Sequence, residues 1–358
     1  MNRKKVLLGM SGGVDSSTAA ILLKEQGYDV TGITFDLWED ESEAGGCGSK
    51  VCVSDAKKVC EKLEIPHIVM ECKEEFKKHV IEDFVNKYND CKTPNPCVEC
   101  NRYLKFRKMY EKASELGIDF ISTGHYANIS YSEKYQRFGI QKSKSLNKDQ
   151  SYVLYNIPKE IIEKIIFPLG EYESKEEIRK KAHEFNLEAA DKPDSQEICF
   201  IPDNDYINFL ENKCQIPKKE GDIVNTSGEI LGRHEGLYKY TIGQRKGIHT
   251  KSNDKLYVIK LDKKTNQLIV GDEKFLFSKE LYAKDINLLL IDEIQEPMKV
   301  YAKIRYKAIE AEATIYPIEN GKMKVEFKEP QRAITPGQSI VFYCDGYVLG
   351  GGKIEETV

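Results

Sequence analysis

The sequence has 358 residues, of which 40% are hydrophobic, 10% aromatic and 31% charged; this composition excludes a disordered or fibrous chain. Lys and Arg number 54 and Asp and Glu 58, giving a net charge of −4, which excludes a uniformly basic nucleic-acid coat but allows a local basic surface. The chain starts without a secretory signal and has no apolar run of about 18 residues. We therefore expect a cytoplasmic protein without membrane contact, in which the ten cysteines stay reduced.

The first 130 or so residues alternate short apolar strands with amphipathic helices. Strands are predicted at 6–10, 30–35, 67–70 and 120–123, and helices at 16–26, 54–63, 74–88 and 103–116. This alternation indicates βαβ units and a doubly wound parallel α/β sheet. Two more helices are predicted at 157–181 and 203–212.

After about residue 216, helical periodicity gives way to short alternating segments at 256–261, 268–270, 300–306, 311–316, 322–327 and 339–343. Turn residues separate these segments, a pattern typical of an all-β barrel. We therefore expect an α/β catalytic domain at 1–207, a small central module at 208–276 and a C-terminal β-barrel at 277–358.

The motif Ser11-Gly-Gly-Val-Asp-Ser-Ser17 lies between the first strand and the first helix. Its glycines allow close approach of a ligand, and its hydroxyls and the free N–H groups of the helix start would form an anion cradle. A Walker loop and a dinucleotide fingerprint are both absent. The alternative is a tight turn with Asp15 or Ser16 as helix N-cap.

This loop resembles the phosphate loop of the N-type ATP pyrophosphatases, which cleave ATP between its α and β phosphates. Further segments narrow the resemblance, namely 93–101 (TPNPCVECN), 195–202 (SQEICFIP), 236–247 (GLYKYTIGQRKG), 123–127, 148–152 and 331–338. With these the chain is identified over its whole length as a member of the MnmA (TrmU) family of tRNA-specific 2-thiouridylases.

The resemblance implies an enzyme that adenylates the 2-oxygen of the wobble uridine of tRNA and replaces it with sulfur. Its implied cofactor is ATP with Mg²⁺, and its implied partners are tRNA and a sulfur donor such as a cysteine desulfurase or a relay protein. A monomer is expected. Cys100 is the implied nucleophile and Cys199 the implied persulfide carrier, with a disulfide between them during turnover.

The resemblance also assigns binding residues. ATP would be bound by Gly9, Met10, Ser11, Gly12, Gly13, Val14, Asp15, Ser16, Ser17, Phe35 and Gly124. The tRNA would be bound by Asn95, Pro96, Cys97, His125, Lys148, Asp149, Gln150, Arg305, Tyr306 and Gln338. Without the resemblance, Asp149 would be the N-cap of a polar helix, and Arg305 and Tyr306 would lie on the solvated face of an alternating strand.

Cysteine chemistry is carried by the thiolate, so its surroundings must lower the thiol pKa. Cys100 is expected just before a helix that begins near residue 101, where the helix dipole would favour the anion. Lys239, Arg245 and Lys246 are expected to contact phosphates of the tRNA backbone, with an internal salt bridge as the alternative for Arg245.

The chain departs from its family at Cys97, where the commonest pattern has aspartate. Cys97, Cys100 and Cys199 would suit a [4Fe–4S] cluster with one open iron, so a persulfide relay and a cluster both remain open. A third interpretation is a structural zinc site that adds Cys47 and Cys52. Four other cysteines are expected to be small apolar residues of the core: Cys60, Cys72, Cys214 and Cys344. No role is assigned to Cys91.

Two other functions compete with tRNA thiolation. The first is an amide- or guanidino-forming ATP pyrophosphatase, which would have no use for Cys100 and Cys199. The second is a non-catalytic tRNA-binding module with a degenerate phosphate loop, against which the intact loop argues.

Overall fold

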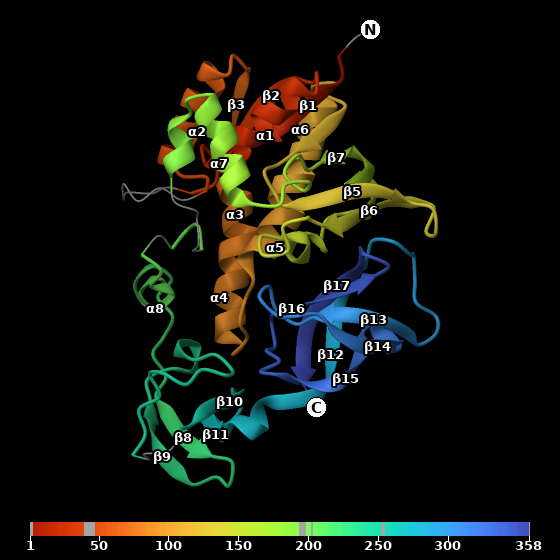
Figure 1. The fold of residues 1–358 in the computed structure, drawn as a ribbon. Helices are drawn as coiled ribbons and strands as arrows, with labels where there is room; N and C mark the ends of the chain where they lie inside the picture. The colour runs from red at the N-terminus through yellow and green to blue at the C-terminus, as the bar shows by residue number, and fades with distance from the viewer. Residues whose placement is uncertain (1–2, 39–46, 193–197, 202, 252–254, 358) are drawn as a thin grey trace.

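The computed structural model describes residues 3–38, 47–192, 198–201, 203–251 and 255–357. Figure 1 shows an α/β layer structure at the N-terminal end, a barrel below it and a small sheet at the far end of the molecule. Residues 195–197 of the second cysteine motif lie outside the described residues. No helix within the described ranges is both long and apolar enough to span a membrane.

A parallel sheet forms the centre of the N-terminal part. Its strands follow the order β3 (His67–Glu71), β2 (Asp29–Asp36), β1 (Lys5–Gly9), β4 (Phe120–Ser122) and β7 (Ile165–Ile166), and each neighbouring pair is parallel. Side chains of successive β1 residues point to opposite faces, so Val6 and Leu8 enter one core and Leu7 the other. The predicted doubly wound α/β sheet is thereby confirmed.

Helices cover both faces of this sheet. On the Val6 face lie α1 (Val14–Glu25), α2 (Lys50–Lys62) and α7 (Lys175–Glu184). On the Leu7 face lie α3 (Lys73–Phe76), α4 (Glu82–Asn89), α5 (Pro96–Cys100) and α6 (Arg107–Glu115). Burial on both faces explains why the strands have nearly continuous apolar sequences.

Three of the predicted helices contain π-helical residues, and the one predicted at 203–212 consists of Tyr206–Asn208 followed by the π segment Phe209–Lys213. The helix predicted at 74–88 consists of α3, the π segment Lys77–Ile81 and α4. The helix predicted at 103–116 begins earlier, because Asn95 and Pro96 occupy its N-cap and first helical position, where proline is favoured. It continues from α5 through the π segment η2 (Asn101–Phe106) into α6.

The helix predicted at 157–181 is wrong. This segment holds a 3₁₀ turn (Lys159–Lys164), strand β7, a loop and only then α7. Pro168 lies in that loop and cannot continue a helix, because it lacks a backbone N–H and clashes with the preceding turn. The hairpin of β5 (Ala127–Ser132) and β6 (Arg137–Lys142) was not predicted.

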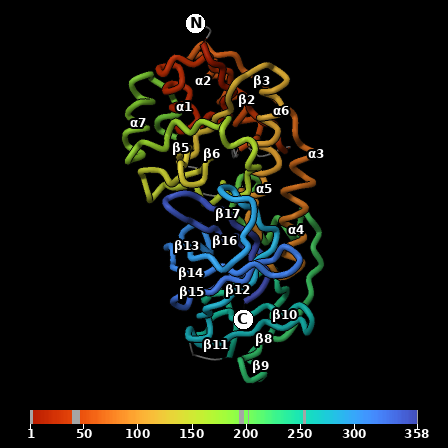
Figure 2. Tube along the Cα trace, turned by 90° about the vertical axis from the view of Figure 1, so that its right-hand side faces the viewer, coloured from red at the N-terminus to blue at the C-terminus, as the bar shows by residue number. Residues whose placement is uncertain are grey.

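The central module is a small sheet with the strand order β10 (Tyr257–Asp262), β11 (Gln267–Gly271), β8 (Gly221–Asn225) and β9 (Ile230–His234). A short helix, α8 (Tyr206–Asn208), and the π segment Phe209–Lys213 precede it. Figure 2 shows this sheet at the opposite end of the molecule from α1 and α2. Single-turn 3₁₀ segments occur at Ser151–Leu154, Glu188–Asp191, Leu237–Lys239, Glu273–Leu276 and Glu319–Gly321.

A closed antiparallel barrel forms the C-terminal part, as predicted. Its strands follow the order β12 (Phe277–Leu288), β15 (Met323–Arg332), β14 (Ala311–Pro317), β13 (Met298–Lys303), β16 (Ser339–Cys344) and β17 (Tyr347–Thr357), and β12 pairs with β17 to close it. Closure removes the free edges of the sheet. Strand β17 also pairs with β6 where Tyr347 faces Gln141, so the barrel is joined to the α/β part.

Candidate functional site

The loop predicted to bind phosphate is a tight turn at the carboxyl end of β1. The backbone N–H of Ser11 donates to Ser16 Oγ at 3.1 Å, and Ser17 Oγ donates to the Gly13 carbonyl at 2.8 Å. Gly12 has φ +69°, and a Cβ there would lie 2.4 Å from the Asp55 Cβ, so only glycine fits. The helix N-cap is Gly13, not Asp15 or Ser16 as the alternative predicted, and no described side chain caps it. The free N–H groups therefore favour an anion.

The opposite wall of this loop comes from the residues that follow β4. A Cβ on Gly124 would lie 2.8 Å from the Ser16 nitrogen, so the two segments touch through backbone. The Tyr126 hydroxyl donates to Asp15 Oδ1 at 2.7 Å, and the Lys175 ammonium lies 2.5 Å from the same oxygen. No local sequence pattern pointed to Lys175, which starts α7 and lies 160 positions after Asp15.

Several other predicted ATP residues flank the same turn. Gly9 ends β1, Met10 and Val14 are buried beside it, and Phe35 is buried at the end of β2. In open α/β sheets, ligands bind at the carboxyl ends of the strands. The structure thus brings all the residues predicted to bind ATP to one edge of the sheet.

The thiols predicted for sulfur chemistry, those of Cys100 and Cys199 with Cys97 in the cluster alternative, all act electrostatically on one cation, Lys105. Cys97 and Cys100 are three residues apart within α5 and share a face of the helix. Cys97 is exposed, Cys100 is buried and Cys199 is partly buried. All three, together with Cys47, raise the pKa of the Lys105 ammonium electrostatically, against the opposing effect of burial. Lys105 was not predicted to belong to this site, and Cys47 was predicted there only in the zinc alternative.

The predicted environment of Cys100 needs correction. Cys100 does not precede a helix; it is the last residue of α5, and the helix continues directly into η2. The helix dipole acts most strongly in the first turn, and the Cys100 thiol lies beyond that turn. Burial instead raises the pKa of Cys100 to about 12, and it also raises the pKa of Cys199. Lys105 lowers both values.

The described residues do not support a metal centre. Within the described ranges, no group of three or more His, Cys, Asp or Glu side chains is placed to hold a metal ion. The [4Fe–4S] alternative with Cys97, Cys100 and Cys199 is therefore not supported, and neither is the zinc site. Cys52 instead lies under the phosphate loop, where its thiol donates to the Ser11 carbonyl at 3.3 Å.

His125 connects the phosphate loop to the thiols. It follows Gly124, and its Nδ1 lies 2.7 Å from Thr123 Oγ1. Its ring lies 5.8 Å from that of Phe106, the residue after Lys105. Burial and, to a smaller extent, Lys105 lower the pKa of His125 to about 3. The imidazole is therefore neutral between the two halves of the site.

In the segment 148–150, predicted to bind tRNA, Asp149 and Gln150 form hydrogen bonds within the protein. Asp149 is buried and accepts hydrogen bonds from the Ser143 N–H at 3.1 Å and the Ser151 hydroxyl at 2.7 Å. It is not a helix N-cap, since Gln150 takes that place in the following 3₁₀ turn. Gln150 Oε1 accepts from the Tyr126 N–H at 2.9 Å. Lys148 and Gln150 are both partly exposed.

Residues of the barrel reach the thiol helix. Arg305 and Tyr306 are exposed in the turn after β13, not on a strand as predicted, because β13 ends at Lys303. Cys97 acts electrostatically on the Tyr306 phenol, so this turn lies near the thiols. Gln338 Nε2 donates to the carbonyls of Thr93 at 3.2 Å and Pro94 at 3.0 Å.

The central module offers fewer free cations than predicted. The Lys239 ammonium forms ion pairs with Glu211 at 2.9 Å and with Glu235 at 2.7 Å. These contacts compete with the phosphate contact that the sequence predicts for Lys239. Arg245 and Lys246 are exposed.

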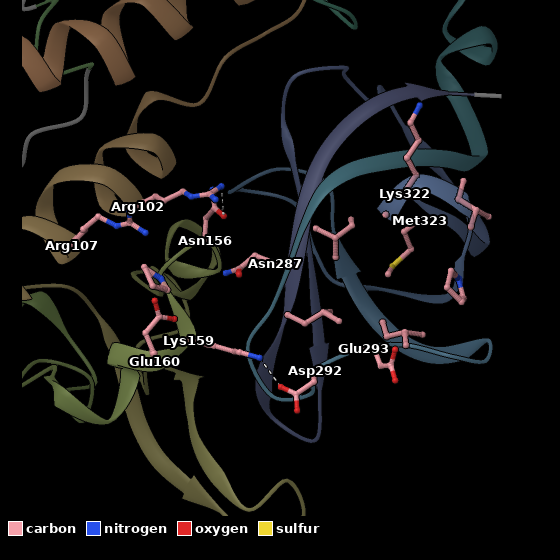
Figure 3. A pocket seen from close by; sticks show the side chains of 17 residues that line it. Arg102, Arg107, Asn156, Lys159, Glu160, Asn287, Asp292, Glu293, Lys322 and Met323 are labelled. Atoms are coloured by element: carbon pink, nitrogen blue, oxygen red, sulfur yellow. Dashed lines mark hydrogen bonds and ion pairs between the residues drawn. The ribbon is translucent and has the colours of Figure 1, made fainter.

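A separate cavity of about 540 Å³ opens between the α/β part and the barrel. Figure 3 shows side chains of both charge signs along it, with the Lys159 ammonium paired to Asp292 at 2.6 Å. None of the residues predicted from the sequence for the functional site lines it. The candidate site is therefore the sheet edge and thiol helix, and not this cavity.

Comparison with known proteins gives consistent matches along the chain. Residues 4–203 match a family model described as the tRNA methyl transferase HUP domain, residues 207–272 the tRNA methyl transferase PRC-barrel domain, and residues 278–354 the aminomethyltransferase beta-barrel domain. The chain is 49% identical over 360 residues to the tRNA-specific 2-thiouridylase MnmA of Acetivibrio thermocellus, covering 99% of this chain and 100% of that protein. It is 47% identical over 362 residues to the MnmA of Clostridium perfringens, covering 100% of both. It is also 47% identical over 358 residues to that of Clostridioides difficile, covering 99% of both.

Proposed function

Since this chain belongs to the MnmA family of tRNA-specific 2-thiouridylases, we propose that it is the ATP-dependent tRNA sulfurtransferase that its full-length relatives are named for. The observation that carries the proposal is that two adjacent residues are linked to both parts of the site. Gly124 contacts the phosphate loop, and His125 is influenced by Lys105, the cation on which the three thiols act. An amide-forming pyrophosphatase would leave the thiols unused. A non-catalytic binding module would not need the loop.

In the first step, the loop 11–17 binds the phosphates of ATP through its free N–H groups and hydroxyls. The 2-oxygen of the wobble uridine attacks the α-phosphorus, a P–O bond forms, and pyrophosphate leaves. When Mg²⁺ is bound, the Asp15 carboxylate would supply an oxygen ligand of the kind that this ion prefers, and Lys175, which pairs with Asp15, would hold that carboxylate in place. The adenylate turns the uridine oxygen into a leaving group.

In the second step, the outer sulfur of a Cys199 persulfide attacks C2 of the adenylated uridine, and AMP leaves with the former 2-oxygen. The Cys100 thiolate then attacks the inner sulfur of Cys199. That attack forms a Cys100–Cys199 disulfide and releases 2-thiouridine in the tRNA. A thiol reductant restores the two cysteines, and a persulfide-bearing donor, such as a cysteine desulfurase or a relay protein, reloads Cys199.

The three parts of the chain would divide the work. We propose residues 1–207 for catalysis, 208–276 as a module that contacts tRNA and 277–358 as a barrel that presents Arg305 and Tyr306 to the anticodon loop. The exposed cation and ring suit a phosphate contact and a stacked base. Asn95, Pro96 and Cys97, at the start of the thiol helix, would face the same loop.

The test is an in vitro reaction with unmodified tRNA, Mg²⁺–ATP, a persulfide donor and a thiol reductant, followed by mass spectrometry of the nucleosides. We expect 2-thiouridine at the wobble position from the wild type. We expect none from Cys199→Ser, while Cys344→Ser, a cysteine of the barrel, keeps the activity. Absence of 2-thiouridine after reaction with folded wild-type protein, or full activity of Cys199→Ser, would overturn the proposal.

A further inference from the structure

The π segment η2 changes which side chains share a face with Cys100. Along an α-helix, five residues turn by about 500°, so residues 100 and 105 would point about 140° apart. In a π-helix the hydrogen bonds join residues i and i+5, which places such residues nearly one above the other. Because η2 spans Asn101–Phe106, Lys105 is turned toward the face of the helix that carries Cys100. Such π segments recur at functional sites.

The surroundings of Lys105 are sulfur and not carboxylate. The groups that act electrostatically on its ammonium are the thiols of Cys47, Cys97, Cys100 and Cys199. Lys105 in turn acts electrostatically on His125, which is neutral. Among the described residues, no Asp or Glu forms an ion pair with Lys105. Its neighbour Lys108, by contrast, pairs with Glu75 at 3.1 Å and Glu111 at 3.8 Å.

A partly buried cation without a carboxylate partner is costly unless an anion compensates it. The only anions that the neighbouring described groups can supply are thiolates or a persulfide. The same cation would offset the burial of Cys100 and Cys199, since a positive charge stabilises the anionic sulfur. The Lys105 ammonium and the sulfur anions of Cys100 and Cys199 would therefore compensate each other's charge.

We propose that Lys105 is the positioning residue of the sulfur site, whose ammonium stabilises and orients the sulfur anions of Cys100 and Cys199. This inference rests on the proposed thiolation and deepens it. When the Cys199 persulfide attacks C2, Lys105 holds the anionic outer sulfur. When Cys100 attacks the inner sulfur of Cys199, the electron pair passes to the sulfur that leaves with the tRNA, and Lys105 holds the attacking thiolate beforehand.

The test measures sulfur reactivity without tRNA or ATP, so its failure is distinct from failure of the proposed function. The full-length variants Lys105→Met, Lys105→Gln and Lys105→Arg are alkylated with iodoacetamide at about pH 8, and each cysteine is quantified by peptide mass spectrometry. We expect Cys100 and Cys199 to react about tenfold more slowly in Lys105→Met and Lys105→Gln, as for a thiol pKa about one unit higher. Lys105→Arg should restore the rate to within about twofold.

Two controls separate charge from damage. Cys344, in the barrel, should react at the wild-type rate in every variant, and Lys108→Met should leave Cys100 and Cys199 unchanged. Two neutral substitutions are made so that a folding failure of one still leaves a measurement. Wild-type rates at both cysteines in a folded neutral variant, or an arginine variant as slow as the neutral ones, would overturn the proposal.

Discussion

At the residue scale, His125 is neutral because burial and the nearby Lys105 lower its pKa. Its folded pKa of about 3 is far below the ordinary value of about 6.5. Above about pH 6.5 the imidazole is neutral in both the folded and the unfolded state, so it makes no pH-dependent contribution there. Below that pH the unfolded state takes up a proton and the folded state does not, so acid destabilises the fold until His125 itself protonates near pH 3.

We therefore predict that His125→Gln weakens the acid sensitivity of folding. Between about pH 7.5 and pH 5, the wild type should lose about 2 kcal/mol more unfolding free energy than the variant. Urea denaturation at both pH values measures this difference. The loss in His125→Gln over the same interval measures the contribution of all other titrating groups, and an identical loss in the wild type would contradict the prediction.

The residue scale also shows what the sequence could and could not predict about the site. The phosphate loop was predictable because glycines, hydroxyls and a helix start are adjacent in the chain. Lys175 was not, because it reaches Asp15 from α7. The pKa direction of Cys100 was predicted wrongly, because it depends on the start of α5 at Pro96 and on burial by distant segments.

At the scale of elements, Glu99 joins the helix that carries the thiols to β17 and to α4 through ion pairs. This carboxylate lies between Cys97 and Cys100 in the chain and is almost fully buried. It accepts ion pairs from Lys353 of β17 at 2.8 Å and from Lys87 of α4 at 3.4 Å. Burial opposes its charge, but Lys353 and Lys87 outweigh this and lower the pKa of Glu99.

We predict that Lys353→Met lowers the free energy of unfolding by about 3 kcal/mol, because it leaves a buried carboxylate with a single, longer ion pair. The double variant Glu99→Gln with Lys353→Met should recover part of this loss. Urea denaturation of both variants and of Glu99→Gln alone gives the coupling between the two side chains.

The matched control is Lys328→Met, whose ammonium pairs with Glu312 at 2.7 Å while both side chains are more than half exposed. A surface pair of this kind contributes at most about 1 kcal/mol. Equal losses in Lys353→Met and Lys328→Met would show that Glu99 is not a buried anchor of the thiol helix.

The elements themselves were predictable where local pattern and tertiary structure agree. Strands β1 to β4 and the barrel strands β13 to β16 lie close to their predicted ranges. The helix predicted at 157–181 fails because its apolar residues pack into the core from turns and a two-residue strand. The hairpin β5–β6 has few strong strand signals; its strands pair with each other, and β6 joins the barrel through one pair with β17.

At the scale of the whole molecule, the barrel contacts the loop before the thiol helix from the far end of the chain. The turn before β16 contacts the loop before α5, where the Thr93 N–H donates to the Pro336 carbonyl at 2.9 Å. A Cβ on Gly337, at φ +92°, would lie 2.8 Å from the Thr93 carbonyl oxygen. Gln338 adds its two bonds to Thr93 and Pro94.

This contact gives Gln338 a role different from the tRNA contact that the family resemblance implies. Its amide N–H groups are already used on backbone carbonyls two and three residues before Pro96, the first residue of the thiol helix. We therefore predict that Gln338→Leu acts on the thiols and leaves tRNA affinity nearly unchanged. The two lost hydrogen bonds correspond to about 1–3 kcal/mol.

The measurement pairs two readouts on the same variant. The rate of 2-thiouridine formation at saturating tRNA should fall about tenfold, and the dissociation constant for tRNA should change less than twofold. Gln331→Leu is the control, because its amide donates only to the Glu329 carbonyl of its own strand among the described residues. A weakened tRNA complex with an unchanged rate at saturation would instead place Gln338 on the tRNA. The barrel would then recognise the substrate without positioning the thiol helix.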